Sequence, residues 1–70
     1  MFSYSLTSLL VFCTVAKLNS FSKAAEALFM TQPGVSNHIK QLEAQIGKRL
    51  LLRGRNGVRL TGDGKTVMRY

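Results

Sequence analysis

Residues 20–47, SFSKAAEALFMTQPGVSNHIKQLEAQIG, contain two predicted helices separated by a short break. Ser20 can cap the first helix, predicted over residues 21–28, because its hydroxyl can accept a hydrogen bond from a first-turn amide that has no helical partner. Thr31 can cap the second helix in the same way. Gly47 is expected to end that helix, since glycine tolerates the left-handed conformation of a helix cap. Two helices joined by about four residues are typical of a helix-turn-helix.

The second of these helices has two chemically different faces. At about 100° per residue, its apolar residues gather on one arc, which predicts the buried face: Val35, Ile39, Leu42 and Ile46. The opposite arc is flanked by Gly34 and Ser36 and carries no acidic residue; its members are Pro33, Asn37, Lys40, Gln41 and Ala44. Amide, hydroxyl and ammonium groups lie there near a helix N-terminus, which itself favours phosphate. This outer face therefore suits DNA.

Upstream, residues 5–17 are predicted to form a helix whose core face recurs at helical spacing: Leu6, Leu9, Phe12, Cys13 and Ala16. Leu10 and Val11 extend the apolar surface beyond this stripe. Two interpretations stay open for them, a contact face against a partner subunit or a helix crowded on two sides within a small core. Cys13 is the single cysteine, and we interpret it as a small buried hydrophobe rather than a ligand or redox sensor.

Downstream, residues 50–60 predict a basic β-hairpin. Asn56 and Gly57 form a strong hairpin signal, because both residues tolerate positive φ. Arginines lie along the same segment: Arg53, Arg55 and Arg59. A basic hairpin beside a helix-turn-helix is a wing, and a solvated turn with arginines scattered for solubility is the alternative. Thr61 can cap a last helix from about Gly62.

Length, composition and charge narrow the class of protein. Seventy residues, of which 46% are hydrophobic, suit one small folded domain, and the apolar runs are too short for the about 20 residues that span a membrane. We expect a cytoplasmic location because no signal-peptide pattern is present. The net charge is +7, and residues 40–70 hold eight of the ten basic residues against two of the three acidic ones. This charge fits either a polyanionic partner, with nucleic acid ahead of a membrane surface, or a basic surface that only keeps the chain in solution, and the charge alone does not choose between them.

Short motifs run through nearly the whole chain in a fixed order. They are S-F-S-K-A-A-E-A-L at 20–28, T-Q-P-G-V-S at 31–36, Q-L-E at 41–43, I-G at 46–47, R-L at 49–50 followed by Arg53, and R-L-T at 59–61 followed by Gly64. In this order and spacing they resemble the N-terminal DNA-binding domain of LysR-type transcriptional regulators. The resemblance also takes in the Leu6, Leu9 and Phe12 spacing of the first helix.

The resemblance implies a mainly α fold, a winged helix-turn-helix with a three-helix core, a short β-hairpin wing and the start of a C-terminal linker helix. Residues 1–60 would be the DNA-binding domain and residues 61–70 the start of the linker, or dimerisation, helix. The implied partners are double-stranded DNA and a second copy of the chain, paired through the linker helix and the first helix. A small-molecule effector would bind only a separate C-terminal domain that this sequence lacks, so the chain looks like an excised domain, with a natural truncation as the alternative.

The implied function is sequence-specific binding of double-stranded DNA, with a recognition helix of about residues 32–46 in the major groove and a wing of about residues 53–59 on the backbone or minor groove. The match to the family implies DNA contacts at the start of this helix, from Thr31, Gln32, Pro33, Ser36 and Asn37, and at the wing, from Arg53 and Arg55. Helical angles independently place Pro33, Asn37 and Lys40 outward, with Ser36 on the flank and Gln32 nearer the core side. Asn37 occupies a position where the family frequently has arginine. Arg53 has a second interpretation, as a structural ion pair of Glu43, which Arg49 could also form.

Other classes of function find less support in the sequence. No paired carboxylates, phosphate-binding glycine loop or nucleophile with a base is present, so we expect no enzyme, and we predict no cofactor or metal. The only histidine, His38, falls at the core margin of its helix and lacks a second metal ligand. The strongest alternative is a protein-interaction module that uses the helix-turn-helix as a scaffold.

Overall fold

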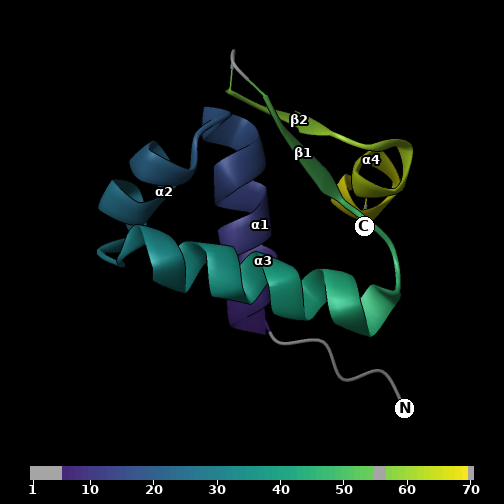
Figure 1. The fold of residues 1–70 in the computed structure, drawn as a ribbon, viewed down its shortest axis with the longest axis horizontal. Coiled ribbons are helices and arrows are strands. Elements are labelled where there is room, and N and C mark those ends of the chain that lie inside the picture. Colours follow the sequence, from purple (N-terminus) through teal and green to yellow (C-terminus); the bar gives the residue numbers. More distant parts are fainter. Residues whose placement is uncertain (1–5, 55–56, 70) are drawn as a thin grey trace.

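The computed structural model describes residues 6–54 and 57–69, which form four helices and one two-stranded antiparallel hairpin. In chain order the elements are α1 Leu6–Leu18, α2 Phe21–Leu28, α3 Gln32–Ile46, β1 Leu51–Gly54, β2 Gly57–Leu60 and α4 Gly62–Met68. Helix α3 crosses α1, α2 lies on one side of α1, and the hairpin and α4 lie on the other (Figure 1). The predicted mainly α winged helix-turn-helix is confirmed. Within the described ranges no helix has the length and apolar character to cross a bilayer.

Side-chain hydroxyls start three of the helices where the sequence predicts them. Each hydroxyl accepts a hydrogen bond of 2.9 to 3.1 Å from the amide three residues later: Ser20 from Lys23, Thr31 from Gly34 and Thr61 from Gly64. Gly47 ends α3 with a φ of 79°, the left-handed conformation expected of it. Phe29 ends α2 with a φ of 55° and its side chain is 97% exposed. Phe29 and Thr31 thus border the turn between α2 and α3.

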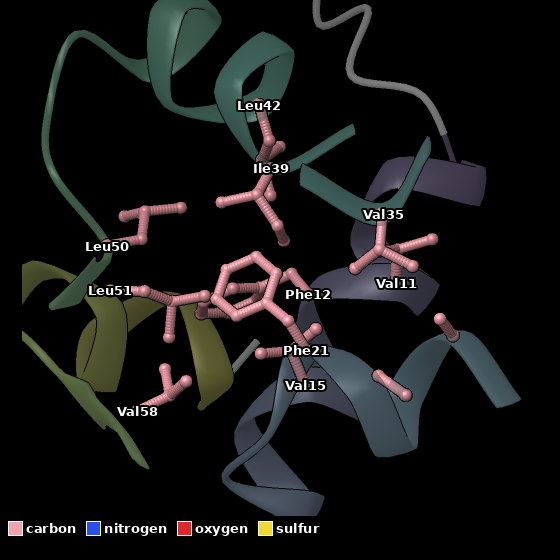
Figure 2. Packing of buried hydrophobic residues seen from close by; sticks show 12 residues of the cluster. Val11, Phe12, Val15, Phe21, Val35, Ile39, Leu42, Leu50, Leu51 and Val58 are labelled. Carbon is pink, nitrogen blue, oxygen red and sulfur yellow. The ribbon is translucent and has the colours of Figure 1, made fainter. Parts of the chain in front are cut away.

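One cluster of buried apolar side chains joins the three large helices to the hairpin (Figure 2). Phe12 of α1 is fully buried, and side chains from all the neighbouring elements converge around it. The predicted inner face of α3 is confirmed for Val35, Ile39 and Leu42, which are buried, while Ile46 packs against the edge of the cluster. Because α3 buries this stripe, its opposite face is left to solvent.

The predicted core face of α1 is confirmed for Phe12, and Leu9 and Cys13 pack against the core, but the prediction is wrong for Leu6. Leu6 is 83% exposed, whereas the buried residues of α1 are Ser8, Val11, Phe12 and Val15. The helix is apolar around most of its circumference, so apolar spacing alone does not select the buried face. Val11, only 1% exposed, belongs to the core and not to a second contact face, but Leu10 is 56% exposed.

A polar contact accounts for the buried serine on this face. Ser8 is 1% exposed, and its Oγ lies 3.1 Å from Nδ1 of His38 on α3. Ser8 was not among the predicted core residues, and its burial costs little because its hydroxyl has a partner. His38 is half-buried at the core margin, as predicted.

The hairpin presents different residues on its two faces. In its register Arg53 pairs with Val58 and Leu52 pairs with Arg59. Since side chains alternate between faces along a strand, Arg53 lies on the face that holds buried Val58 and Arg59 lies on the opposite face. The hairpin is also tied to α1, because the Asn19 side-chain amide, oriented to satisfy both carbonyls, donates to Ala16 O at 3.1 Å and Val58 O at 3.2 Å.

Candidate nucleic-acid interface

The outer face of α3 has the exposure that the sequence predicts. Pro33, Asn37 and Lys40 are exposed, and Ser36 at its flank is half-buried. Thr31 and Gln32, at the start of the helix, are also exposed. The exposed members of this face offer an amide and an ammonium group and no carboxylate, which matches an anionic partner.

Arg53 on β1 is held against the start of α2. Its guanidinium carbon Cζ lies 3.9 Å from the centroid of the Phe21 ring, a distance typical of a cation–π contact. Phe21 is buried, with 7% of its surface exposed, whereas Arg53 is exposed. The guanidinium therefore covers the outer side of a core residue, and its in-plane N–H donors stay available to an anion.

Arg53 also lines two surface hollows that connect the hairpin to the recognition helix. One, of about 240 Å³, lies between the start of α2, Gln32 and the hairpin. The other, of about 120 Å³, lies between β1 and α3 and is lined by Ser36, Lys40 and Arg49. The structure thus brings four of the predicted DNA-binding residues, from two separate elements, onto one continuous side of the molecule: Gln32, Ser36, Lys40 and Arg53.

Gln32 has a defined partner on the other helix of the motif. Its Nε2 donates to Ser22 Oγ at 2.6 Å, and both side chains are exposed. The helical angle of Gln32 places it nearer the core side, so the sequence alone did not decide its direction. Its exposure agrees with the family-based prediction that it lies on the DNA-facing side.

Glu43 has a structural role that differs from the predicted one. Its Oε2 accepts hydrogen bonds from the backbone amides of Leu50 at 2.8 Å and Leu51 at 3.3 Å. Within residues 6–54 and 57–69, Glu43 forms no ion pair with Arg53 or Arg49, so the second interpretation of Arg53 does not hold. The two amides lie where the chain passes from α3 to β1 and have no partner within a helix. The Glu43 carboxylate satisfies them.

The structure describes all of the predicted DNA-binding residues except one. Arg55, predicted at the wing, lies outside the described residues. Phe21 and Ser22 were missed as contributors to the site, although they follow directly after the cap Ser20 and so lie in the first turn of α2. Across the described ranges, no group of three or more histidine, cysteine, aspartate or glutamate side chains is placed to hold a metal ion.

Comparison with known proteins agrees with this geometry. The family model described as "Bacterial regulatory helix-turn-helix protein, lysR family" matches residues 6–65. The chain is 45% identical over 65 residues to the "Uncharacterized HTH-type transcriptional regulator YvbU" of Bacillus subtilis (strain 168), covering 91% of this chain and 22% of the relative. It is 46% identical over 59 residues to the "HTH-type transcriptional regulator HdfR" of Salmonella newport (strain SL254), covering 84% and 21%. The chain thus spans about a fifth of the length of these curated relatives.

A solved structure with the same fold contains DNA. The structure described as "Crystal Structure of BenM_DBD/catB site 1 DNA Complex" superposes with a TM-score of 0.89 at 38% sequence identity. The match covers 94% of this chain and 74% of that one. The similarity therefore extends over α1 to α4 and includes the helix-turn-helix and the wing.

Proposed function

This chain belongs to the lysR family of bacterial regulatory helix-turn-helix proteins, and from that premise we propose that it binds double-stranded DNA in a sequence-specific way. The family is one of regulators and not of enzymes. The observation that carries the proposal is the outer face of α3, whose exposed residues are not acidic, together with Arg53 on the same side of the molecule. Glu43 also lines the hollow between them, but its carboxylate is bonded to the Leu50 and Leu51 amides. An α-helix fits the major groove of DNA, where base edges are distinguishable, and a basic hairpin can grip the adjacent backbone.

The proposed arrangement places the start of α3 in the major groove and the wing on the backbone or minor groove. The first turn of α3, from Thr31 to Pro33, would lie closest to the DNA. Asn37 and Lys40 follow on the same face, one and two turns further along the helix. Arg53 would contact a phosphate, and the match to the family implies the same role for Arg55.

Selection of bound sequences from a random duplex pool tests this function. A recurrent motif in the selected duplexes supports a DNA reader. Retention of duplexes without any shared motif would instead favour the alternative, a protein-interaction module whose basic surface binds DNA only through its charge.

Asn37→Ala and Lys40→Ala should affect DNA binding differently. Asn37 is a short amide that cannot neutralise a phosphate, so its task in a major groove is hydrogen bonding to a base edge. Its replacement should cost roughly 1 to 3 kcal/mol on the selected site and little on scrambled DNA. Lys40 is a flexible point charge suited to the backbone, and its replacement should weaken binding to both duplexes by similar factors.

Titration of both variants against the two duplexes at one salt concentration measures this difference. Both residues are exposed on α3, and alanine favours helix, so the fold should survive either change. Equal losses for Asn37→Ala on the two duplexes, or no loss on either, would contradict a reading role for this residue.

We also propose that residues 61–70 begin a linker helix and that two copies of the chain pair through it and through α1. Apolar groups are exposed on α1, where Leu6 is 83% and Leu10 56% exposed. Val67 and Met68 of α4 pack only partly against the core. Residues 1–60 would then be the DNA-binding domain, working in the cytoplasm, and small-molecule control would belong to a separate C-terminal domain.

Self-association should therefore be weak in this chain and should decrease further in Leu10→Lys, which places a charge on the proposed pairing face. Analytical ultracentrifugation over a range of concentrations measures it. A version with a longer C-terminal helix should associate more strongly. If the chain and its extended version are both strictly monomeric, the pairing proposal is wrong.

A further inference from the structure

Ser22 and Gln32 connect the two helices of the helix-turn-helix by a side-chain hydrogen bond. Ser22 lies in the first turn of α2, Gln32 begins α3, and the Nε2 to Oγ distance is 2.6 Å. Both residues are exposed, so the bond does not satisfy a buried polar atom and a core role does not explain it. Its direct consequence is the orientation of the Gln32 side chain.

The bond decides which hydrogen-bonding groups Gln32 offers to a partner. A free glutamine amide has two N–H donors and one acceptor oxygen, and its side chain samples many rotamers. With one N–H donated to Ser22, the acceptor Oε1 and a single N–H remain. Adenine presents one donor, N6–H, and one acceptor, N7, in the major groove, whereas guanine presents two acceptors there. The groups left on Gln32 therefore match adenine.

We propose that Ser22 is a positioning residue that holds Gln32 ready to read adenine in the major groove, an inference that rests on the proposed DNA-binding function. Ser22 acts through Gln32 and not through its own contact with DNA. By ordering a long side chain before the DNA arrives, it lowers the conformational entropy that is lost on binding. It thereby raises the affinity for the preferred site without adding a base contact.

A double-mutant cycle tests this coupling on the selected site, a version in which the base that Gln32 reads is replaced, and a scrambled duplex. Gln32→Ala should weaken binding to the selected site. Ser22→Ala should weaken it about three- to tenfold, the range expected for one hydrogen bond, and should have no effect on the scrambled duplex. In the Gln32→Ala background, Ser22→Ala should cause no further loss.

Two controls separate positioning from folding and from charge. Ser22→Thr keeps the hydroxyl and should restore the affinity and the base preference. Circular dichroism and thermal unfolding of Ser22→Ala should match the unmodified chain, because the side chain is exposed and alanine favours helix.

Four results would overturn the inference. Equal losses for Ser22→Ala on selected and scrambled DNA, or a loss that persists in the Gln32→Ala background, would show that Ser22 itself contacts a phosphate. An unchanged preference for the selected base in Ser22→Ala would show that the bond has no role in reading. If the unmodified chain prefers no duplex at all, the proposed function is wrong, and the inference is wrong as well because it rests on that function. A clear preference that survives Ser22→Ala defeats the inference alone.

Discussion

Gly64→Ala is expected to lower the free energy of unfolding by roughly 3 kcal/mol, at the upper end of the usual cost of overpacking. Gly64 is buried in the first turn of α4, and a Cβ added there would overlap the Leu50 carbonyl oxygen. That carbonyl cannot move freely, because it accepts the Thr61 amide at 3.0 Å. A domain of this size has a total stability of roughly 4 to 10 kcal/mol, so the midpoint of thermal unfolding should fall by more than about 10 °C.

Gly62→Ala provides the matched control within the same turn. Gly62 is exposed, and a Cβ added there would meet nothing within 4 Å. Because alanine favours helix over glycine, the thermal midpoint of this variant should stay the same or rise slightly. Calorimetry of both variants compares them directly. Similar midpoints for the two would show that α4 does not pack against the Leu50 backbone as described.

The helix boundaries were largely predictable because local chemistry sets them. Ser20, Thr31 and Thr61 each cap a helix through their hydroxyl, which bonds an amide only three residues away in the sequence. Gly47 ends α3 for an equally local reason, the positive φ that glycine tolerates. The inner face of α3 was predictable as well, because its apolar residues fall on one narrow arc with polar residues opposite.

The buried face of α1 was only partly predictable from periodicity, which identified Phe12 but not Val11 or Val15, because the helix is apolar on several sides. What selects the face is a contact between residues thirty positions apart, Ser8 with His38, together with the packing of α2 and α3 against Val11 and Phe12. A sequence pattern can show that a helix has more apolar residues than one buried face holds. It cannot show which of them the neighbouring elements will cover.

The candidate site was likewise predictable only in its local features. The outward position of Asn37 and Lys40 follows from helical angles, and the structure confirms their exposure. The partners of Gln32 and Arg53, which are Ser22 and Phe21, depend on how α2 meets α3 and β1 and so lie beyond local pattern. Whether these residues contact DNA stays a prediction.

Arg53→Ala should reduce both the affinity for duplex DNA and its salt dependence. If Arg53 neutralises one phosphate, the slope of log affinity against log salt should become shallower by about 0.9. A charged hydrogen bond to a phosphate lost with it should weaken binding roughly tenfold or more at low salt. The Arg53 guanidinium stacks on the Phe21 ring, with its Cζ 3.9 Å from the ring centroid. This contact leaves the in-plane N–H donors of the guanidinium available to the phosphate. Binding titrations at four or five salt concentrations give the slope.

Arg59→Ala removes the same charge from the opposite face of the hairpin and is therefore the matched control. Arg59 is exposed and pairs with Leu52, which is 49% exposed, whereas Arg53 shares its face with buried Val58. The two variants have equal net charge, so a general electrostatic effect would change both slopes equally. A phosphate contact confined to the α3 side would change only the Arg53→Ala slope. Equal slopes for the two variants would mean that the wing attracts DNA by its charge without placing Arg53 on a phosphate.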